Sequence, residues 1–343
     1  MRRWPSLVST ALIACVSTAL LAGASVAHAG SSKLPYTHLR IGSPTDAAPA
    51  RLQGGTVLMG GSTDVDAAFA WMCARSPGGD FLVLRASGTD AYNPYVQGVC
   101  AAAGAATNSV ATLIVPTATA ANDSRVEALV RAADAIWIAG GDQSDYINAW
   151  KGSKLQAALN QRIVDGVPVG GTSAGLNVLT PFVYTAQASK GVTSAQALAD
   201  PFNRYLSFDR DFATVPQLAG LIGDPHFAAR DRMGRDLAFL CRVHGFGWAA
   251  APRAVAIDEE TALLVDAQGA ATVVGSGRVY FLHAGTPPEV CAPKTPLTLR
   301  DVDVYRIDAA GRFDLGRWTG RGGAAYRVTA EQGVLSSSTG TVY

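Results

Sequence analysis

Histidine and charge are both scarce in this sequence. Only five of the 343 residues are histidine and 16% are charged, whereas 48% are hydrophobic. This composition is typical of a globular protein that buries a large apolar core. No internal repeat or low-complexity block occurs in the chain. We therefore expect residues 54–343 to form a single catalytic domain.

Long apolar runs are also absent, apart from one at the N-terminus. Arg2 and Arg3 precede that run, and small residues ending in Ala27-His28-Ala29 follow it. A basic start, an apolar centre and an A-x-A site predict a signal peptide over residues 1–29. A membrane anchor is the alternative, but it needs about 20 apolar residues and no cleavage site. We expect a secreted or periplasmic protein, cleaved after Ala29 and without stable membrane insertion.

Neither a large net charge nor a zinc-like cysteine spacing is present once the signal peptide is removed. The remaining 26 basic and 27 acidic side chains give a formal net charge of −1, which does not predict a nucleic-acid partner. Cys73, Cys100, Cys241 and Cys291 remain, an even number in an oxidising compartment. One or two disulfides are expected, with three full pairings open. Their spacings match no zinc motif, so we expect no metal and no cofactor.

The organisation of the chain changes along its length. Residues 30–53 are rich in Ser, Pro, Ala and Thr and are predicted to form a linker arm. Short apolar runs then alternate with helix-compatible stretches, which predicts an α/β, doubly wound and mainly parallel sheet. These runs cover 54–61, 81–87, 109–116, 135–141 and 167–171. Past residue 200 the pattern predicts antiparallel strands added at one side of the sheet, with about 291–343 as the last of them.

The sequence Gly171-Thr172-Ser173-Ala174-Gly175 lies where a strand should give way to a helix. It matches G-x-S-x-G, whose glycines allow the tight turn that exposes a serine hydroxyl. The following helix would direct the positive end of its dipole at that hydroxyl. Ser173 is therefore a candidate nucleophile, although a packing constraint could also require a small residue there.

A serine nucleophile needs a base, and few histidines are available. His38 lies in the predicted arm, which leaves His226, His244 and His283. His226 could be a loop histidine beside a solvated helix whose charges pair locally. His283 ends an apolar strand and would serve an esterase of the α/β-hydrolase type, where the order is Ser, acid, His. That fold also needs an HGGG-type loop before the serine, and none occurs here.

Four sequence blocks occur in this order: IWIAGGDQ (136–143), GGTSAGL (170–176), DPHFAARDRMGR (224–235) and AIDEETAL (256–263). Together they resemble the cyanophycinases and, more distantly, the aspartyl dipeptidases called peptidase E. The resemblance covers residues 54–282 and implies a sheet similar to that of class I glutamine amidotransferases. Cyanophycinases are serine hydrolases that release β-aspartyl-arginine dipeptides from a poly-aspartate whose side chains carry arginine.

The resemblance implies a role for each matching residue. Ser173 corresponds to the nucleophile, His226 to the general base and Glu259 to the acid that orients the histidine. In such a triad the histidine takes the hydroxyl proton during attack, and the carboxylate stabilises the imidazolium. The amides of Gly141 and Ala174 would bind the developing oxyanion.

The resemblance also implies a substrate site. Gln143 corresponds to a substrate-binding glutamine, and Arg230, Arg232 and Arg235 to an arginine cluster suited to carboxylates. Asp142 and Glu260 offer counter-charge for a guanidinium group.

Two departures from the family pattern bear on specificity. Pro225 stands where many cyanophycinases have glutamine, and Ile147 replaces an expected basic residue, although Lys151 lies one turn further on. A peptide or cyanophycin-like polymer is therefore the expected substrate class, with isoaspartyl peptides as an alternative. A non-catalytic binding protein on the same fold also stays open, and a homodimer is compatible with the sequence.

Overall fold

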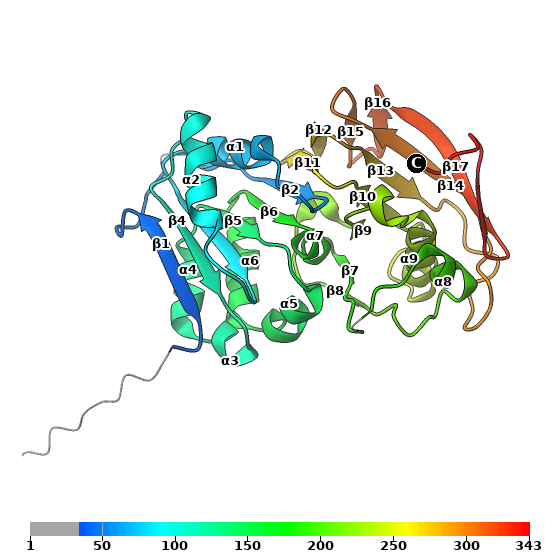
Figure 1. Ribbon diagram of the computed structural model, residues 1–343, viewed down its shortest axis with the longest axis horizontal. Helices are drawn as coiled ribbons and strands as arrows, with labels where there is room; N and C mark the ends of the chain where they lie inside the picture. The colour runs from blue at the N-terminus through cyan, green and yellow to red at the C-terminus, as the bar shows by residue number, and fades with distance from the viewer. Residues whose placement is uncertain (1–33, 50, 189) are drawn as a thin grey trace, which may run out of the picture. The chain divides into compact units, whose positions relative to one another are not determined.

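The computed structural model describes residues 34–49, 51–188 and 190–343. Within these ranges, Pro35–Tyr343 form one compact unit (Figure 1). The predicted signal peptide lies outside the described residues. No helix in the described part of the chain is long and apolar enough to cross a membrane.

The first sheet has a parallel centre and antiparallel margins. In the described residues it contains ten strands, in the order β1-β4-β3-β5-β6-β2-β11-β12-β15-β16. The pairs from β4 to β2 are parallel, and β1, β11, β12, β15 and β16 pair antiparallel. The strands are β1 (Thr37–Gly42), β2 (Gly55–Met59), β3 (Asp80–Arg85), β4 (Ser109–Ile114), β5 (Ala135–Ile138), β6 (Val169–Thr172), β11 (Thr261–Asp266), β12 (Ala270–Gly275), β15 (Arg312–Asp314) and β16 (Thr319–Arg321). The predicted α/β class with parallel central strands is confirmed.

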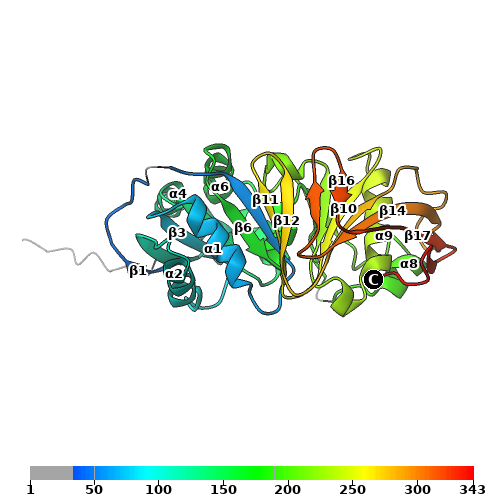
Figure 2. The ribbon, with the colours of Figure 1, turned by 90° about the horizontal axis from the view of Figure 1, so that it is seen from above.

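Helices cover both faces of this sheet, as Figure 2 shows. Side chains alternate along the strands, so Val57 and Val83 pack with α1 and α2, whereas Leu58 and Leu82 pack with the helices on the other face. Strands buried on both faces are expected to be mainly apolar, as β3 to β5 are, although the polar residues Asp80 in β3 and Thr112 in β4 are also buried. The helices are α1 (Asp66–Arg75), α2 (Tyr92–Ala102), α3 (Ala118–Ala121), α4 (Ser124–Arg131), α5 (Gln143–Trp150), α6 (Lys154–Val164), α7 (Ala174–Leu179), α8 (Ser194–Ala199) and α9 (Met233–Gly245).

A second sheet, which the sequence pattern did not predict, lies beside the first. Counted within the described ranges it has eight strands, in the order β18-β17-β14-β13-β10-β9-β7-β8. One face packs against α8 and α9, and the other joins the core of the first sheet through Val255 and Phe281. The strands are β7 (Phe182–Tyr184), β8 (Phe208–Arg210), β9 (Leu221–Asp224), β10 (Arg253–Ile257), β13 (Val279–His283), β14 (Leu299–Ile307), β17 (Ala324–Glu331) and β18 (Val334–Ser337). Two short 3-10 turns, Pro216–Leu218 and Ala228–Arg230, complete the elements.

The prediction that the later strands all extend one sheet is therefore only partly right. β11, β12, β15 and β16 extend the first sheet, whereas β10, β13, β14, β17 and β18 join the second. β10 also pairs with β9 in parallel rather than antiparallel. The chain changes sheets at the turn between β10 and β11, where Glu260 has a φ of 54°. Apolar alternation identifies a strand but not its partner, so the pattern could not reveal this change.

The predicted linker arm is wrong for part of its length. Thr37–Gly42 form β1, which pairs with β4 in an antiparallel register that runs from Thr37 opposite Ile114 to Gly42 opposite Ser109. The side-chain amide of Asn93 also donates to the carbonyl of Leu39 over 2.9 Å. Because an edge strand needs little apolar surface of its own, its composition resembled that of a loop.

Two disulfides join the four cysteines within the described residues. Cys73–Cys100 links α1 to α2 with Cα atoms 5.7 Å apart, and Cys241–Cys291 links α9 to the segment after β13 with Cα atoms 6.0 Å apart. Of the three pairings left open by the sequence, the structure contains this one.

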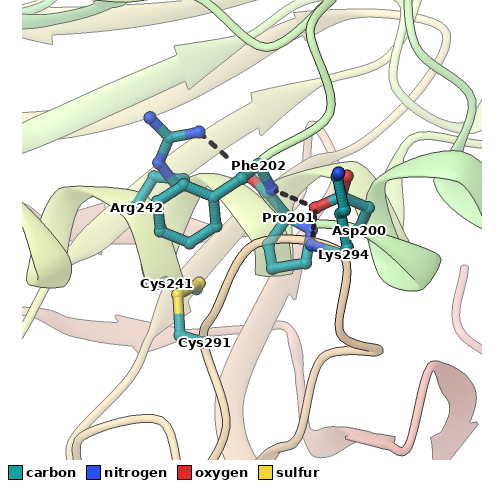
Figure 3. The surroundings of a disulfide bond; sticks show 7 residues. All are labelled: Asp200, Pro201, Phe202, Cys241, Arg242, Cys291 and Lys294. Atoms are coloured by element: carbon teal, nitrogen blue, oxygen red, sulfur yellow. Dashed lines mark hydrogen bonds between the residues drawn. A yellow bond between two sulfur atoms is a disulfide. The ribbon is translucent and has the colours of Figure 1, made fainter.

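The second disulfide lies among contacts that hold the same segment (Figure 3). The carboxylate of Asp200 accepts from the backbone amides of Phe202, over 2.9 Å, and Lys294, over 3.0 Å. Arg242, next to Cys241, donates to the carbonyl of Pro201 over 3.1 Å and stacks on the ring of Phe202. The loop that carries Cys291 is thus attached to α8 and α9 by both covalent and polar contacts.

Candidate active site

Ser173 occupies the corner between β6 and α7. Its backbone φ is 52° and ψ is −111°, a conformation that costs energy for a residue with a Cβ atom. The amide of Ser173 donates to the carbonyl of Met59 on the neighbouring strand β2 over 3.0 Å. This strand-to-helix geometry matches the nucleophile elbow predicted from the G-x-S-x-G pattern.

The last glycine of that pattern has a steric reason. A Cβ atom at Gly175 would overlap the carbonyl oxygen of Ile138 in β5, so any larger residue would push α7 away from the sheet. The first turn of α7 therefore stays close to the carboxyl ends of β5 and β6. Ser173 is held at that edge by tight packing beneath it.

His226 lies directly against Ser173. Its Nε2 atom is 2.8 Å from the Ser173 Oγ atom, although the two residues are far apart in the sequence. His226 follows β9 and has a φ of 53°. Its backbone amide donates to the carbonyl of Gly60, directly after β2, over 2.8 Å. The amide of Phe227 donates to the carbonyl of Ile257, at the end of β10, over 3.1 Å. Backbone contacts to the ends of two other strands thus fix the strained residue.

Glu259 completes a chain of three polar side chains. Its Oε1 atom lies 2.6 Å from Nδ1 of His226, and the glutamate side chain is 31% exposed. Glu259 stands in the turn between β10 and β11, at the point where the chain changes sheets. The structure therefore brings Ser173, His226 and Glu259 together from three separate connections.

Gly61 is a site residue that we did not identify from the sequence. Its φ is 92°, and a Cβ atom there would overlap the imidazole ring of His226. The carbonyl of Gly61 also accepts from the amide of Glu260 over 2.9 Å. The only signal in the sequence was the glycine pair at the end of an apolar strand.

The surroundings of His226 favour its neutral form. Burial is the largest influence and lowers the pKa of His226 below its ordinary value of 6.5. The hydrogen bond to Glu259 opposes this shift, whereas the positive charges of Arg230 and Arg232 add to it. A neutral imidazole is the form that can accept a proton from a serine hydroxyl.

Gly141 and Ala174, which are expected to form the oxyanion site, lie after β5 and at the start of α7. Ala174 is the first residue of α7, where a helix amide has no partner within the helix. Gly141 follows β5, is exposed, and has a φ of 159°. Its neighbour Gly140 is close enough to Ser173 that an added Cβ atom would lie 3.7 Å from the serine Cβ. Both predicted amides therefore lie at the strand edge that carries the nucleophile.

The three predicted arginines differ in their surroundings. Arg230 is 53% exposed, and its Nε atom is 3.7 Å from Oε1 of Glu259. Arg235 is only 3% exposed and donates from Nε to Asp224 over 3.0 Å, with a second bond from its Nη2 atom. Arg232 donates from Nη1 to Asp224 over 3.2 Å and to the carbonyl of Pro225 over 2.6 Å.

The prediction that Arg235 binds substrate is therefore wrong for this structure, because its guanidinium group is buried against Asp224. Arg232 is largely committed to the same carboxylate. The alternative in which the charges of this helix pair locally is also wrong for Arg232 and Arg235, since Asp224 is their partner. The sequence pattern missed Asp224 because a carboxylate at the end of a buried strand pairs with residues on the following helix. Of the cluster, Arg230 alone keeps an exposed guanidinium group near the triad.

The other two predicted substrate residues lie at the start of α5. The Asp142 carboxylate accepts from the amide of Ser144 over 2.8 Å and so caps the helix, while its residue stays exposed. Gln143 donates from Nε2 to the carbonyl of Tyr184 over 3.1 Å. Lys151, at the end of the same helix, forms an ion pair with Asp209. Both predicted residues follow Gly141 directly and remain near the elbow.

His283 lies elsewhere. It ends β13 and stands opposite Arg253 on one side and Asp303 on the other. Burial and the charge of Arg253 lower the pKa of His283. The hydrogen-bond partner of Ser173 is His226, so this arrangement does not support the esterase alternative.

A metal centre is not evident in the described ranges. No group of three or more His, Cys, Asp or Glu side chains there is arranged to hold a metal ion.

Comparison with known families decides the relationship of the chain. A model of peptidase family S51 matches residues 57–273, which is more than half of the sequence. The chain belongs to peptidase family S51. Ser173, His226 and Glu259 all lie within the matched residues, whereas the strands from β13 onward lie outside them.

Curated relatives within family S51 include cyanophycinases from Nostoc sp. and from Trichormus variabilis. Each is 27% identical to this chain over 200 residues, and each match covers 56% of this chain. The chain spans 60% of the length of these relatives. The resemblance to cyanophycinases inferred from four sequence blocks is confirmed.

Two solved structures also align with this S51 chain. One is a peptidase from an acI-B1 actinobacterium, with a TM-score of 0.49 and 14% identity, covering 78% of this chain and 98% of that chain. The other is a putative peptidase E protein from Listeria monocytogenes, with a TM-score of 0.42 and 12% identity, covering 66% of this chain and 100% of that chain.

Proposed function

We propose that this chain is an exported serine peptidase that hydrolyses aspartyl or β-aspartyl peptide bonds, with Ser173, His226 and Glu259 as its catalytic triad. The observation that carries the proposal is the chain of two hydrogen bonds, 2.8 Å from Ser173 Oγ to His226 Nε2 and 2.6 Å from His226 Nδ1 to Glu259 Oε1. Membership of a peptidase family supports it.

The proposed reaction proceeds in two stages. His226 takes the proton of the Ser173 hydroxyl as the oxygen attacks the scissile carbonyl carbon, and Glu259 stabilises the imidazolium that forms. The amides of Gly141 and Ala174 donate to the oxyanion. His226 then gives its proton to the leaving amine, and the acyl group stays on Ser173. Water, deprotonated by His226, releases the acid and restores the serine.

Substrate preference follows from the charge beside the triad. Arg230 offers an exposed guanidinium group near Glu259, and a guanidinium binds a carboxylate through two parallel hydrogen bonds. Asp142, at the start of α5, offers an exposed carboxylate for a cationic side chain. An aspartyl-arginine unit carries both charges, and the relatives named cyanophycinase support this class.

Export is part of the same proposal. The signal-peptide pattern over residues 1–29 predicts a mature N-terminus at Gly30. The two disulfides support an oxidising compartment, because they persist chiefly in exported proteins. N-terminal sequencing of the exported protein should begin at Gly30, and an intact N-terminus at Met1 would contradict export with cleavage.

The test is incubation of the purified mature protein with cyanophycin and, separately, with β-aspartyl dipeptides, followed by mass analysis of the products. We expect β-aspartyl-arginine from the polymer, and none from a folded Ser173→Ala variant. Cleavage of the dipeptides alone would shift the specificity to the peptidase E type. No hydrolysis of either substrate would remove the aspartyl specificity and favour a non-catalytic protein.

A further inference from the structure

The residues between His226 and α9 form a short segment that we call the arginine loop, residues 226–233. Its first half is fixed by backbone bonds to the neighbouring strands, from His226 and Phe227. Its second half contains Arg230, the exposed guanidinium near Glu259, and ends at the first residue of α9. The contacts that fix the second half of the arginine loop therefore influence the position of Arg230.

The Tyr343 hydroxyl group bridges the end of the arginine loop. It donates to the Asp231 carboxylate over 2.8 Å and accepts from the amide of Met233 over 2.9 Å. Arg232, which precedes α9, provides no side-chain cap to the helix. The tyrosine hydroxyl from a distant part of the chain thus satisfies a helix amide that would otherwise lack a protein partner.

Tyr343 is itself held firmly. Its ring packs edge-on against Phe227, at 5.5 Å between centroids, and against Tyr280, at 6.2 Å. The hydroxyl of Tyr326 donates to the carbonyl of the preceding residue, Val342, over 2.8 Å. Burial and the hydrogen bond to Asp231 raise the pKa of Tyr343, so the hydroxyl keeps the proton that it donates.

The loop conformation needs this support because it is strained. Asp231 has a φ of 47° and His226 one of 53°, both in the left-handed region that non-glycine residues seldom adopt. Such residues persist where surrounding contacts over-determine them. Arg230 lies directly before Asp231, so a change of backbone conformation at Asp231 would move the guanidinium group.

We propose that Tyr343 is a positioning residue that holds Arg230 beside the active site through its bridge between Asp231 and Met233, and so sets the affinity for substrates that carry a carboxylate. This inference rests on the proposed function, because it takes Ser173 as the nucleophile and Arg230 as the carboxylate-binding group. Tyr343 lies after β18 and outside the residues matched by the family model, so the bridge comes from the C-terminal segment of this chain. His226 has its own backbone anchors, so at a pH well above the pKa of His226 the bridge affects binding of the acidic group rather than activation of the serine.

The test compares Tyr343→Phe, which removes only the hydroxyl, with Tyr305→Phe in the full mature chain. Tyr305 is a matched control because its hydroxyl accepts from the amide of Gly323 over 3.1 Å, away from the arginine loop. A neutral fluorophosphonate labels the activated serine, and its rate reports the Ser173–His226 pair without a carboxylate. The β-aspartyl-arginine dipeptide, added as a competitor, protects the serine and yields an inhibition constant.

We expect Tyr343→Phe to raise that inhibition constant about tenfold, the factor for one weakened charge-assisted hydrogen bond, with the labelling rate within about twofold of wild type. Tyr305→Phe should change neither quantity. Asp231→Ala should reproduce the effect, and the double variant should add little to it, because both changes break the same bridge.

Three outcomes would overturn the inference. One is an unchanged inhibition constant in Tyr343→Phe, and another is a labelling rate that falls in parallel with the binding, as a general loss of folding would produce. The third is the absence of protection in the wild type. A wild-type protein that the fluorophosphonate does not label would instead contradict the proposed function itself.

Discussion

The Nε atom of Arg230 lies 3.7 Å from Oε1 of Glu259, the same oxygen that bonds His226. A cation is thus placed next to the acid of the candidate triad rather than only in the path of the substrate. It competes with the imidazolium for the glutamate charge and repels the protonated form of His226. Arg230 can therefore influence both the acidity of the histidine and the binding of a carboxylate.

The pH dependence of activity tests the first of these influences. Burial, Arg230 and Arg232 lower the pKa of His226, so the acid limb of kcat/KM should have its midpoint below 6.5 in the wild type. Arg230→Gln removes a positive charge that disfavours the imidazolium, so the pKa of His226 should rise and the limb should move to higher pH. Arg204→Gln, at an exposed position that stacks on Tyr205, is the control. A limb that stays in place or moves to lower pH in Arg230→Gln would contradict this electrostatic role.

The buried pair of Asp224 and Arg235 should matter for stability rather than for specificity. Asp224→Asn leaves a buried guanidinium without its counter-ion, a change that typically costs about 3–5 kcal/mol. Urea unfolding near neutral pH measures this loss. If Asp224→Asn were as stable as the wild type, the carboxylate would not be the partner that keeps Arg235 buried.

Asp236 provides a contrast within the same cluster. Burial, and then the neighbouring Asp224 carboxylate, raise the pKa of Asp236 well above its ordinary value. The folded chain therefore holds this proton at pH values where the unfolded chain has released it, so this carboxyl group makes folding less favourable as the pH rises. Asp236→Asn removes that dependence and should leave stability unchanged or higher, increasingly so at higher pH. A large loss of stability near neutral pH would show that the charged form is required.

The disulfides give a separate prediction. They close loops of 27 and 50 residues, for which the loop-entropy model predicts a stabilisation of roughly 3–4 kcal/mol each. Cys241→Ser should lower the free energy of unfolding by about that amount, and a reductant should have a similar effect on each bridge in the wild type. Thiol titration of the denatured, unreduced mature chain should find no free cysteine. Four free thiols would contradict both bridges.

Local patterns in the sequence predicted the first sheet and the elbow well. The G-x-S-x-G residues form a strand-to-helix corner because their glycines permit close packing, and Gly175 does so against Ile138. Those features depend on neighbours in the sequence or on the next strand, so they can be predicted from spacing. The choice of His226 over His283 could not be made from spacing and came from the family resemblance.

The second sheet and the partners of the arginines could not be predicted in this way. β10 and β11 have similar apolar patterns, yet the turn at Glu260 sends them to different sheets. Arg235 was predicted to belong to a substrate-binding arginine cluster, whereas it is buried against Asp224 from the preceding strand. Each outcome depends on which segments, distant in the sequence, pack together in the fold. The pattern of residues along the sequence does not reveal that.

The effect of Ser173→Ala on turnover tests the triad most directly. With a substrate identified among the aspartyl peptides, kcat should fall by roughly four to six orders of magnitude in the folded variant, because the covalent route is lost. The kcat of His226→Ala should fall by a similar factor. The kcat of His283→Ala should stay within about twofold of the wild type, since His283 lies near Arg253 and Asp303 and not at Ser173. Near-normal turnover by a folded Ser173→Ala protein would contradict the assignment of Ser173 as the nucleophile.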